Sequence, residues 1–320
     1  MNNVNKIKFI TIFITFILLS FLLTGCSEKY QDLLECLEVN LSEISINNYT
    51  ASVTEDGDNI FYVSHDGIYK IGKKSLVKER ICKTEAPQNL YVYEGQVFFT
   101  DRDRANLFRI GKDGNKETIV ESSMYRYTTG SRCIEDYFID GSKVYIFSAS
   151  MAFSYDMTDG TVRNVVGDEG VSALGIYEGK PVFIEHASET FTVYSLDTSG
   201  EKKVILGTNV VRPAKDIITD FRVFDDLLFC TKRSPDGVFV YENGIERELF
   251  SGKTNQIFVK NGNLFFSSDD GALYRYDGQL RKIELSASLP ANGRFIIIDS
   301  ICLFKGSDGM VRAEIIKAET

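Results

Sequence analysis

The stretch that decides the fold is "NLFFSSDDGALYRYDGQLRKIEL", residues 263–285. It contains three short runs of apolar and aromatic residues, separated by two turns that contain Asp and Gly. This pattern is typical of antiparallel strands that are joined by hairpins. A fourth run, "QIFVKNG" at residues 256–262, comes directly before it. Together the four runs predict one four-stranded antiparallel sheet.

The same unit recurs along the chain. The turn residue in front of its aromatic strand is found at Gly57, Gly95, Gly141, Gly179, Asp226, Gly262 and Ser300, in steps of 36 to 47 residues. A period near forty residues with four strands in each unit is typical of the blades of a β-propeller. We therefore predict an all-β fold, a seven-bladed β-propeller with four-stranded blades.

The two ends of the chain must close this ring. The seventh unit ends with its third strand, "VRAEIIKA" at residues 311–318, and "EVNLSEISI" at residues 38–46 reads as a lone strand before the first unit. An unclosed ring would leave unpaired strand edges. We expect residues 38–46 to supply the outer strand of the last blade, so that residues 38–320 form one propeller domain.

Residues 1–25 have the pattern of a secretory signal. Lys6 and Lys8 are followed by the uncharged run Phe9 to Leu23, which is shorter than the roughly 20 residues of a membrane-spanning helix. An uncleaved membrane anchor is the alternative.

The sequence "Leu-Thr-Gly-Cys" at residues 23–26 resembles the lipobox of bacterial lipoproteins. The resemblance implies that the Cys26 thiol is acylated and that the chain is cut just before Cys26. It also implies a location on the outer, extracytoplasmic face of the cell membrane, where the lipid on Cys26 holds the protein. Residues 26–37 would then be a tether, in which "KYQDLLECLE" at residues 29–38 could form a helical turn or two.

The repeated units also resemble a bacterial propeller family. Units such as "QVFFTDRDRANLFRIGKDGNKETIV" are similar to those of a family of unknown function that is named for its likeness to the YWTD propeller of low-density-lipoprotein receptors. The resemblance covers about residues 49–320. It is incomplete, because no unit has the full YWTD tetrad and the chain has no Trp.

The charge of the chain limits its partners. It has 36 Lys and Arg against 45 Asp and Glu. Attraction to phosphates supplies most nucleic-acid affinity, so this acidic chain is not expected to bind nucleic acid.

The sequence predicts neither a metal nor a cofactor. His65 and His186 are the only histidines and lie three units apart. Asp101 and Asp103 have the spacing of a calcium loop but lack its glycine and its final Glu, which favours a charged hairpin turn. The remaining cysteines are expected to be free thiols, mostly buried: Cys36, Cys82, Cys133, Cys230 and Cys302.

Two long connectors mark a candidate binding face. Residues 122–132 and 208–216 join the outer strand of one unit to the inner strand of the next, and such connectors all emerge on one face of a propeller. Tyr and Arg are common interface anchors, so the predicted face comprises Tyr125, Tyr127, Arg126, Arg132, Arg212 and Lys215. Ordinary variation in loop length is the alternative explanation.

These features predict a lipid-anchored binding or interaction module of the cell envelope, with a protein, peptide or glycan partner. The alternative is a propeller enzyme, a hydrolase or lyase that acts on an extracellular polymer at the central mouth. Carboxylates near the axis with raised pKa values would favour the enzyme.

Overall fold

A computed structural model describes residues 31–41, 52–111, 113–129, 133–148, 151–166, 170–177, 180–186, 190–196, 201–211, 218–225, 227–233, 235–242, 245–260, 262–289, 294–306, 308 and 310–316. No helix within these residues is both long enough and apolar enough to cross a membrane.

The strands follow one another in sets that each form one antiparallel sheet. Blade 1 contains β1 (Val53–Glu55), β2 (Asn59–Ser64), β3 (Gly67–Gly72) and β4 (Lys78–Lys83). Blade 2 contains β5 (Gln88–Tyr93), β6 (Gln96–Thr100), β7 (Leu107–Ile110) and β8 (Lys116–Val120). Blade 3 contains β9 (Asp136–Asp140), β10 (Lys143–Ser148), β11 (Met151–Asp156) and β12 (Val162–Val166). Blade 4 contains β13 (Gly170–Tyr177), β14 (Lys180–His186), β15 (Thr190–Leu196) and β16 (Lys202–Val211). Blade 5 contains β17 (Ile218–Phe224), β18 (Leu227–Arg233), β19 (Asp236–Glu242) and β20 (Ile245–Ser251). Blade 6 contains β21 (Thr254–Lys260), β22 (Asn263–Ser268), β23 (Leu273–Tyr276) and β24 (Leu280–Ile283). Blade 7 contains β25 (Phe295–Ile298), β26 (Ile301–Lys305) and β27 (Val311–Ile315).

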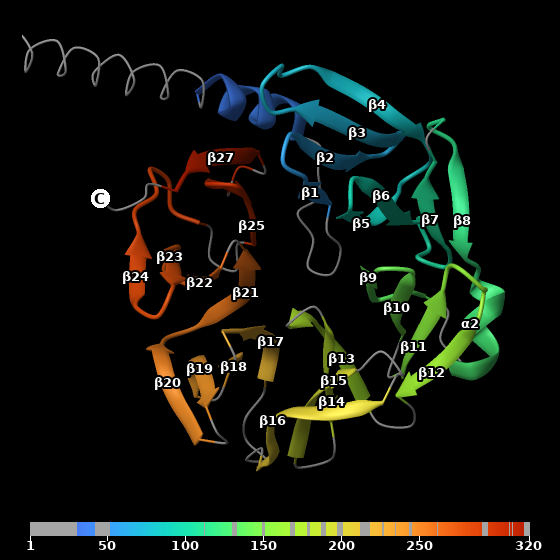
Figure 1. The fold of residues 1–320 in the computed structure, drawn as a ribbon. Coiled ribbons are helices and arrows are strands. Elements are labelled where there is room, and N and C mark those ends of the chain that lie inside the picture. The colour runs from blue at the N-terminus through green and yellow to red at the C-terminus, as the bar shows by residue number, and fades with distance from the viewer. Residues whose placement is uncertain are drawn as a thin grey trace, which may run out of the picture.

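The seven sheets are arranged around a central axis, with the first strand of each blade innermost (Figure 1). The prediction of an all-β, seven-bladed propeller is confirmed. Six of the sheets have four strands, and the described part of the seventh has three.

Each blade is apolar on both faces, which explains why the repeated strands read as continuous apolar runs. Successive side chains of a strand point to opposite faces. In β22, Phe265 packs toward blade 7 in a cluster with Phe295. Its neighbours Leu264 and Phe266 pack toward blade 5 in a cluster with Phe229. Similar clusters fill all seven interfaces between neighbouring blades.

The outermost strands are polar instead. Lys78, Glu79 and Arg80 of β4 and Lys116 and Glu117 of β8 are exposed. Charged side chains protect such strand edges against pairing with other chains. The described cysteines are free, as predicted, and Cys82, Cys230 and Cys302 are buried.

The interface between the last and first blades has an additional element. Residues 31–41 form a helix that lies beside β27 on one side and beside blade 1 on the other (Figure 1). Leu33, Leu37 and Leu41 of this N-terminal helix are spaced four residues apart, and all three are buried. Residues at this spacing lie on the same face of a helix. They pack into one cluster with Val53, Ile60, Tyr62, Ile71, Ile298, Ile301, Leu303, Val311 and Ala313.

The N-terminal helix also covers part of the open edge of blade 7. The backbone N–H of Ala313, in the edge strand β27, donates a hydrogen bond of 3.1 Å to the Glu38 carboxylate. The prediction of a strand from residue 38 was therefore wrong for residues 38–41, which are helical, because the leucine spacing buries one helical face. The rest of that segment, residues 42–46, lies outside the described residues.

A cluster of charges completes the closure of the ring. The Glu55 carboxylate, at the end of β1, lies 2.6 Å from Lys73 Nζ and 2.7 Å from Lys260 Nζ of blade 6. Lys73 Nζ lies 2.7 Å from the carboxylate of Asp299 in blade 7, and the Asp299 backbone N–H donates to Glu55. One carboxylate thus joins blades 1, 6 and 7.

The environment of Glu55 keeps it ionised. Burial alone would raise the pKa of Glu55, but the hydrogen bonds from Lys260, Lys73 and the Asp299 N–H outweigh this effect, so the pKa lies below its usual range. Burial likewise opposes the charge of Lys73, and its hydrogen bonds to Asp299 and Glu55 raise its pKa overall.

The packing of the helix can be tested with one buried and one exposed residue. Leu37→Ala should lower the free energy of unfolding by about 2–5 kcal/mol, because it leaves a cavity at the closing interface. Val39→Ala is the matched control, since Val39 is 74% exposed and exposed substitutions usually change stability by less than about 0.5 kcal/mol. Urea unfolding measures both. Equal values for the two variants would show that the helix does not stabilise the ring.

The charge cluster predicts a specific dependence of stability on pH. Because the folded state lowers the pKa of Glu55, its contribution to stability is present above its unfolded pKa of about 4.3 and is lost as the pH falls through the lower, folded pKa. The difference in unfolding free energy between wild type and Glu55→Gln should therefore shrink between about pH 5 and pH 3. The control Glu79→Gln removes the exposed pair with Lys70 and should show a much smaller change. A constant difference for Glu55→Gln would contradict the cluster.

Candidate functional site

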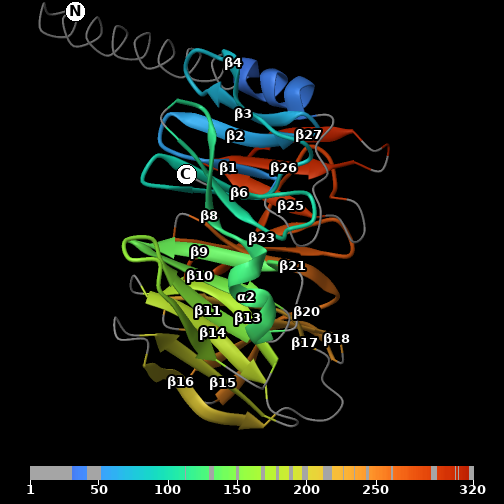
Figure 2. The ribbon, with the colours of Figure 1, turned by 90° about the vertical axis from the view of Figure 1, so that its right-hand side faces the viewer.

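The first of the two long connectors forms a helix that packs against the ring. This helix, α2 (Ser122–Thr129), lies at the periphery beside blades 2 and 3 (Figure 2). Tyr125 is fully buried, donates a hydrogen bond of 2.7 Å to the carbonyl oxygen of Ala105, and stacks on Phe153 at 5.3 Å. The prediction that Tyr125 is an exposed binding residue was wrong, because the aromatic side chain of Tyr125 fills the interface between blades 2 and 3.

The other residues of the predicted face remain predictions. The backbone of Arg126 and Tyr127 lies in α2, but their side chains are not described. Arg132, Arg212 and Lys215 lie outside the described residues. The second connector begins later than predicted, since residues 208–211 continue strand β16.

Among the described residues, one carboxylate on the inner wall of the ring, that of Asp136, has a raised pKa. Asp136 is the first residue of the inner strand β9. Asp136 is accessible to solvent, but the surrounding protein atoms of the inner wall reduce its solvation. This desolvation raises the pKa of Asp136 to about 6. The hydrogen bond from the Tyr137 N–H and the positive charge of Arg222 lower the pKa, but by less. Arg222 of β17 is itself paired with Asp220 at 2.6 Å.

Two tyrosines support this part of the wall. Tyr137 donates a hydrogen bond of 2.5 Å to the carbonyl oxygen of Asn89, and Tyr91 contacts its ring edge-on at 6.1 Å. Burial raises the pKa of Tyr91, and Tyr93 and Asp136 raise it further. With a pKa of about 6, Asp136 can donate or accept a proton near neutral pH. General acid–base chemistry also needs a second group that is positioned against the substrate.

The described residues bring no metal ligands together. They contain no group of three or more His, Cys, Asp and Glu side chains that could hold an ion. The predicted turn at Asp101 is confirmed, because its carboxylate accepts hydrogen bonds from the N–H groups of Ala105 and Asn106 and from the Asn106 side chain.

A buried lysine in blade 5 has a structural explanation. Lys232 is 1% exposed, lies 2.5 Å from the Glu246 carboxylate, and sits over the ring of Phe239 at 4.5 Å. The Tyr241 hydroxyl donates to the same carboxylate. A buried charge that is paired and hydrogen-bonded in this way needs no ligand.

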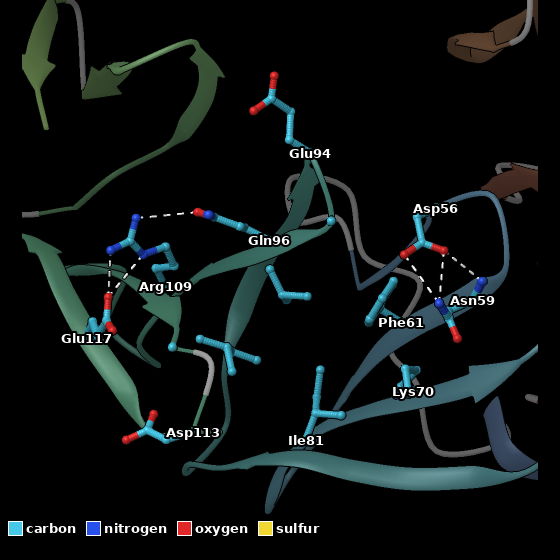
Figure 3. A pocket seen from close by; sticks show the side chains of 14 residues that line it. Asp56, Asn59, Phe61, Lys70, Ile81, Glu94, Gln96, Arg109, Asp113 and Glu117 are labelled. Atoms are coloured by element: carbon cyan, nitrogen blue, oxygen red, sulfur yellow. Dashed lines mark hydrogen bonds and ion pairs between the residues drawn. The ribbon is translucent and has the colours of Figure 1, made fainter.

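A concave surface in the described part of the chain lies between blades 1 and 2. This groove has a volume of about 810 Å³ and is lined by turn and strand residues of both blades (Figure 3). Its walls come from the β1–β2 turn, which carries Asp56, the β5–β6 turn, which carries Glu94, and the β7–β8 turn, which carries Asp113. These turns meet because consecutive blades repeat the same hairpins side by side.

The floor of the groove is apolar. Phe61, Val97 and the half-buried Ile81 and Ile110 belong to the cluster that packs blade 1 against blade 2. A second hollow of about 580 Å³ shares Ile81, Ile110 and Asp113 with the groove and extends it along β4. The β7–β8 turn packs closely against Ile81 of β4, and this packing needs glycine at position 114. The φ angle there is +78°, and a Cβ would lie 3.3 Å from the Ile81 carbonyl oxygen.

Charged side chains form the rim. Arg109 binds the Glu117 carboxylate with two hydrogen bonds of 3.0 and 2.7 Å and also contacts Gln96 at 3.4 Å. No local sequence pattern predicts this site. Its acidic turns resemble ordinary hairpin turns, and only the apposition of two blades makes them one surface.

Comparisons with known proteins support the fold. No protein-family model matches the chain, and no curated protein matches it. Among solved structures, the chain is similar to a streptogramin B lyase, with 12% identity over 86% of this chain and 96% of that one and a TM-score of 0.60. It is also similar to virginiamycin B lyase from Staphylococcus aureus, with 12% identity over 84% and 95% of the chains and a TM-score of 0.58.

A third similar structure is PorZ, a surface component of the type-IX secretion system of Porphyromonas gingivalis. Identity is 10%, the TM-score is 0.56, and the match covers 87% of this chain but 39% of PorZ. At these identities, the likeness shows the β-propeller fold alone.

Proposed function

We propose that this protein is a binding module of the bacterial cell envelope, held by lipid on the outer face of the membrane. The observation that carries the binding role is the groove between blades 1 and 2, which combines an apolar floor with a charged rim. Interfaces commonly have this composition, with an apolar centre and a polar border. The partner is a polypeptide of the envelope.

The location is proposed from the N-terminal sequence. Residues 1–25 have the pattern of a secretory signal, and Leu23 to Cys26 resemble a lipobox, so the lipid on Cys26 would anchor the protein. The repeated units resemble those of a YWTD-like propeller family of unknown function, although no family model matches the chain. PorZ, a propeller of similar fold, is named as a bacterial surface component, which is compatible with such a role.

A second candidate function is a propeller enzyme, a hydrolase or lyase, and Asp136 favours it. Perturbed pKa values cluster at functional sites, and the pKa of about 6 places Asp136 near the range of a general acid or base. The two lyases show that similar folds carry lyase activity. The binding role has more support, because the groove combines an apolar floor with a charged rim, whereas Asp136 is a single group.

Lipid anchoring is tested at Cys26. Cys26→Ala removes the thiol that acylation requires, so mature-size protein should no longer remain with membranes after an alkaline wash. Fractionation and immunoblotting measure this. Mature-size Cys26→Ala protein in the washed membranes would contradict the proposed anchor.

The binding role is tested by photo-crosslinking at the groove. A photo-reactive residue in place of Gln96, on the groove rim, should form a discrete adduct with one envelope protein when intact producing cells are irradiated. The control position is Ile245, which is 71% exposed on β20 of blade 5. The adduct should be absent or much weaker there. Equal adducts at both positions, or none at Gln96, would refute a binding role for the groove.

A further inference from the structure

The cations that line the groove have ion-pair partners, whereas three of its acids have no cation partner among the described residues. Leaving aside Arg80 and Lys83 in the extension along β4, both cations of the groove are paired with carboxylates: Arg109 with Glu117 at 2.7 Å, and Lys70 with Glu79 at 3.0 Å. Neither is therefore available to a negatively charged ligand without breaking an existing ion pair.

Three acids of the groove have no cation partner among the described residues. Within the described part of the chain, Asp56 and Asp113 accept hydrogen bonds only from amide groups of their own turns, at Asp58, Asn59 and Asn115. The Asn115 hydrogen bonds lower the pKa of Asp113, so it is ionised at neutral pH. Glu94 is exposed and takes part in no hydrogen bond or ion pair of the described structure.

These acids surround the apolar floor. In Figure 3, Glu94, Asp56 and Asp113 lie on three sides of the groove, and Ile81 lies between Asp56 and Asp113. A ligand that fills the groove therefore meets aliphatic side chains in the centre and negative charge at the border. Phe61 is only 4% exposed and offers no open ring face for stacking a sugar.

We propose that the groove takes a segment of a partner polypeptide that carries Lys or Arg next to aliphatic residues. This inference rests on the proposed binding role and adds the chemistry of the partner. The cationic groups would approach Glu94, Asp113 and Asp56, and the aliphatic groups would cover Ile81 and Ile110. Complementary charge favours the correct partner and speeds association, whereas an acidic partner would meet repulsion. The net charge of −9 for the whole chain favours the same partner at longer range.

Three labelled peptides of eight residues test the proposal: alternating Lys and Val, alternating Glu and Val, and alternating Ser and Val. The full chain is captured on a sensor surface by a C-terminal tag, and binding is measured at two salt concentrations. The Lys peptide should bind more tightly than both others, and its advantage should decrease at high salt because ions screen exposed charges.

Matched variants locate the effect. Glu94→Gln with Asp113→Asn should weaken Lys-peptide binding by about tenfold, since each exposed ion pair contributes up to about 1 kcal/mol. Glu94→Gln alone should weaken binding of the Lys peptide by about threefold. This single variant removes no hydrogen bond of the described structure, so it tests the proposal even if Asp113→Asn disturbs the β7–β8 turn. The control is Glu242→Gln with Glu248→Gln, which removes the same charge from exposed positions of blade 5 and should change binding by less than about twofold.

Equal binding of the three peptides would overturn the proposal, and so would equal losses in the groove and control variants. These results are distinct from failure of the binding role. A specific adduct at Gln96 without a preference for the Lys peptide would leave a binding groove of different chemistry, whereas absence of the adduct removes the binding role itself.

Discussion

The whole structure depends on closing the interface between blade 7 and blade 1. Each blade has two apolar faces, so an open ring would leave two of them in water. The chain meets this constraint with the N-terminal helix, whose Leu33, Leu37 and Leu41 pack against both blades. Glu38 covers a backbone N–H of the edge strand, and Glu55 binds lysines of blades 1 and 6. Residues 31–37 of the predicted tether are thus part of the fold.

The sequence predicted the ring well because the determining signal is local and repeated. Paired apolar residues such as Phe265 and Phe266 must face opposite interfaces in any strand, so seven such strands predict seven blades. The closing element was harder to predict. "EVNLSEISI" alternates enough to suggest a strand, but the leucines at positions 33, 37 and 41 carry a helical spacing that begins upstream. Choosing between the two patterns required knowing that both neighbouring blades offer an apolar surface to the helix.

The functional site was less predictable for a different physical reason. Tyr125 and Arg126 are adjacent in a polar connector, and nothing local distinguishes a tyrosine that fills an interface from one on the surface. Only the hydrogen bond to Ala105 and the stacking on Phe153 make that distinction for Tyr125. The groove has the opposite problem. Asp56, Glu94 and Asp113 are each common turn residues, and their shared surface arises only when two blades are placed side by side.

The closing interface and the groove are connected through one turn. Lys73 Nζ, which binds Glu55 and Asp299 at the closure, also donates a hydrogen bond of 2.9 Å to the carbonyl oxygen of Asp56. The side chain of Asp56 lines the groove. Ion pairs that hold the ring closed therefore also fix the position of a groove residue. Because the groove floor is itself the packing cluster of blades 1 and 2, a ligand would bind to a surface whose shape is set by the packing of these two neighbouring blades.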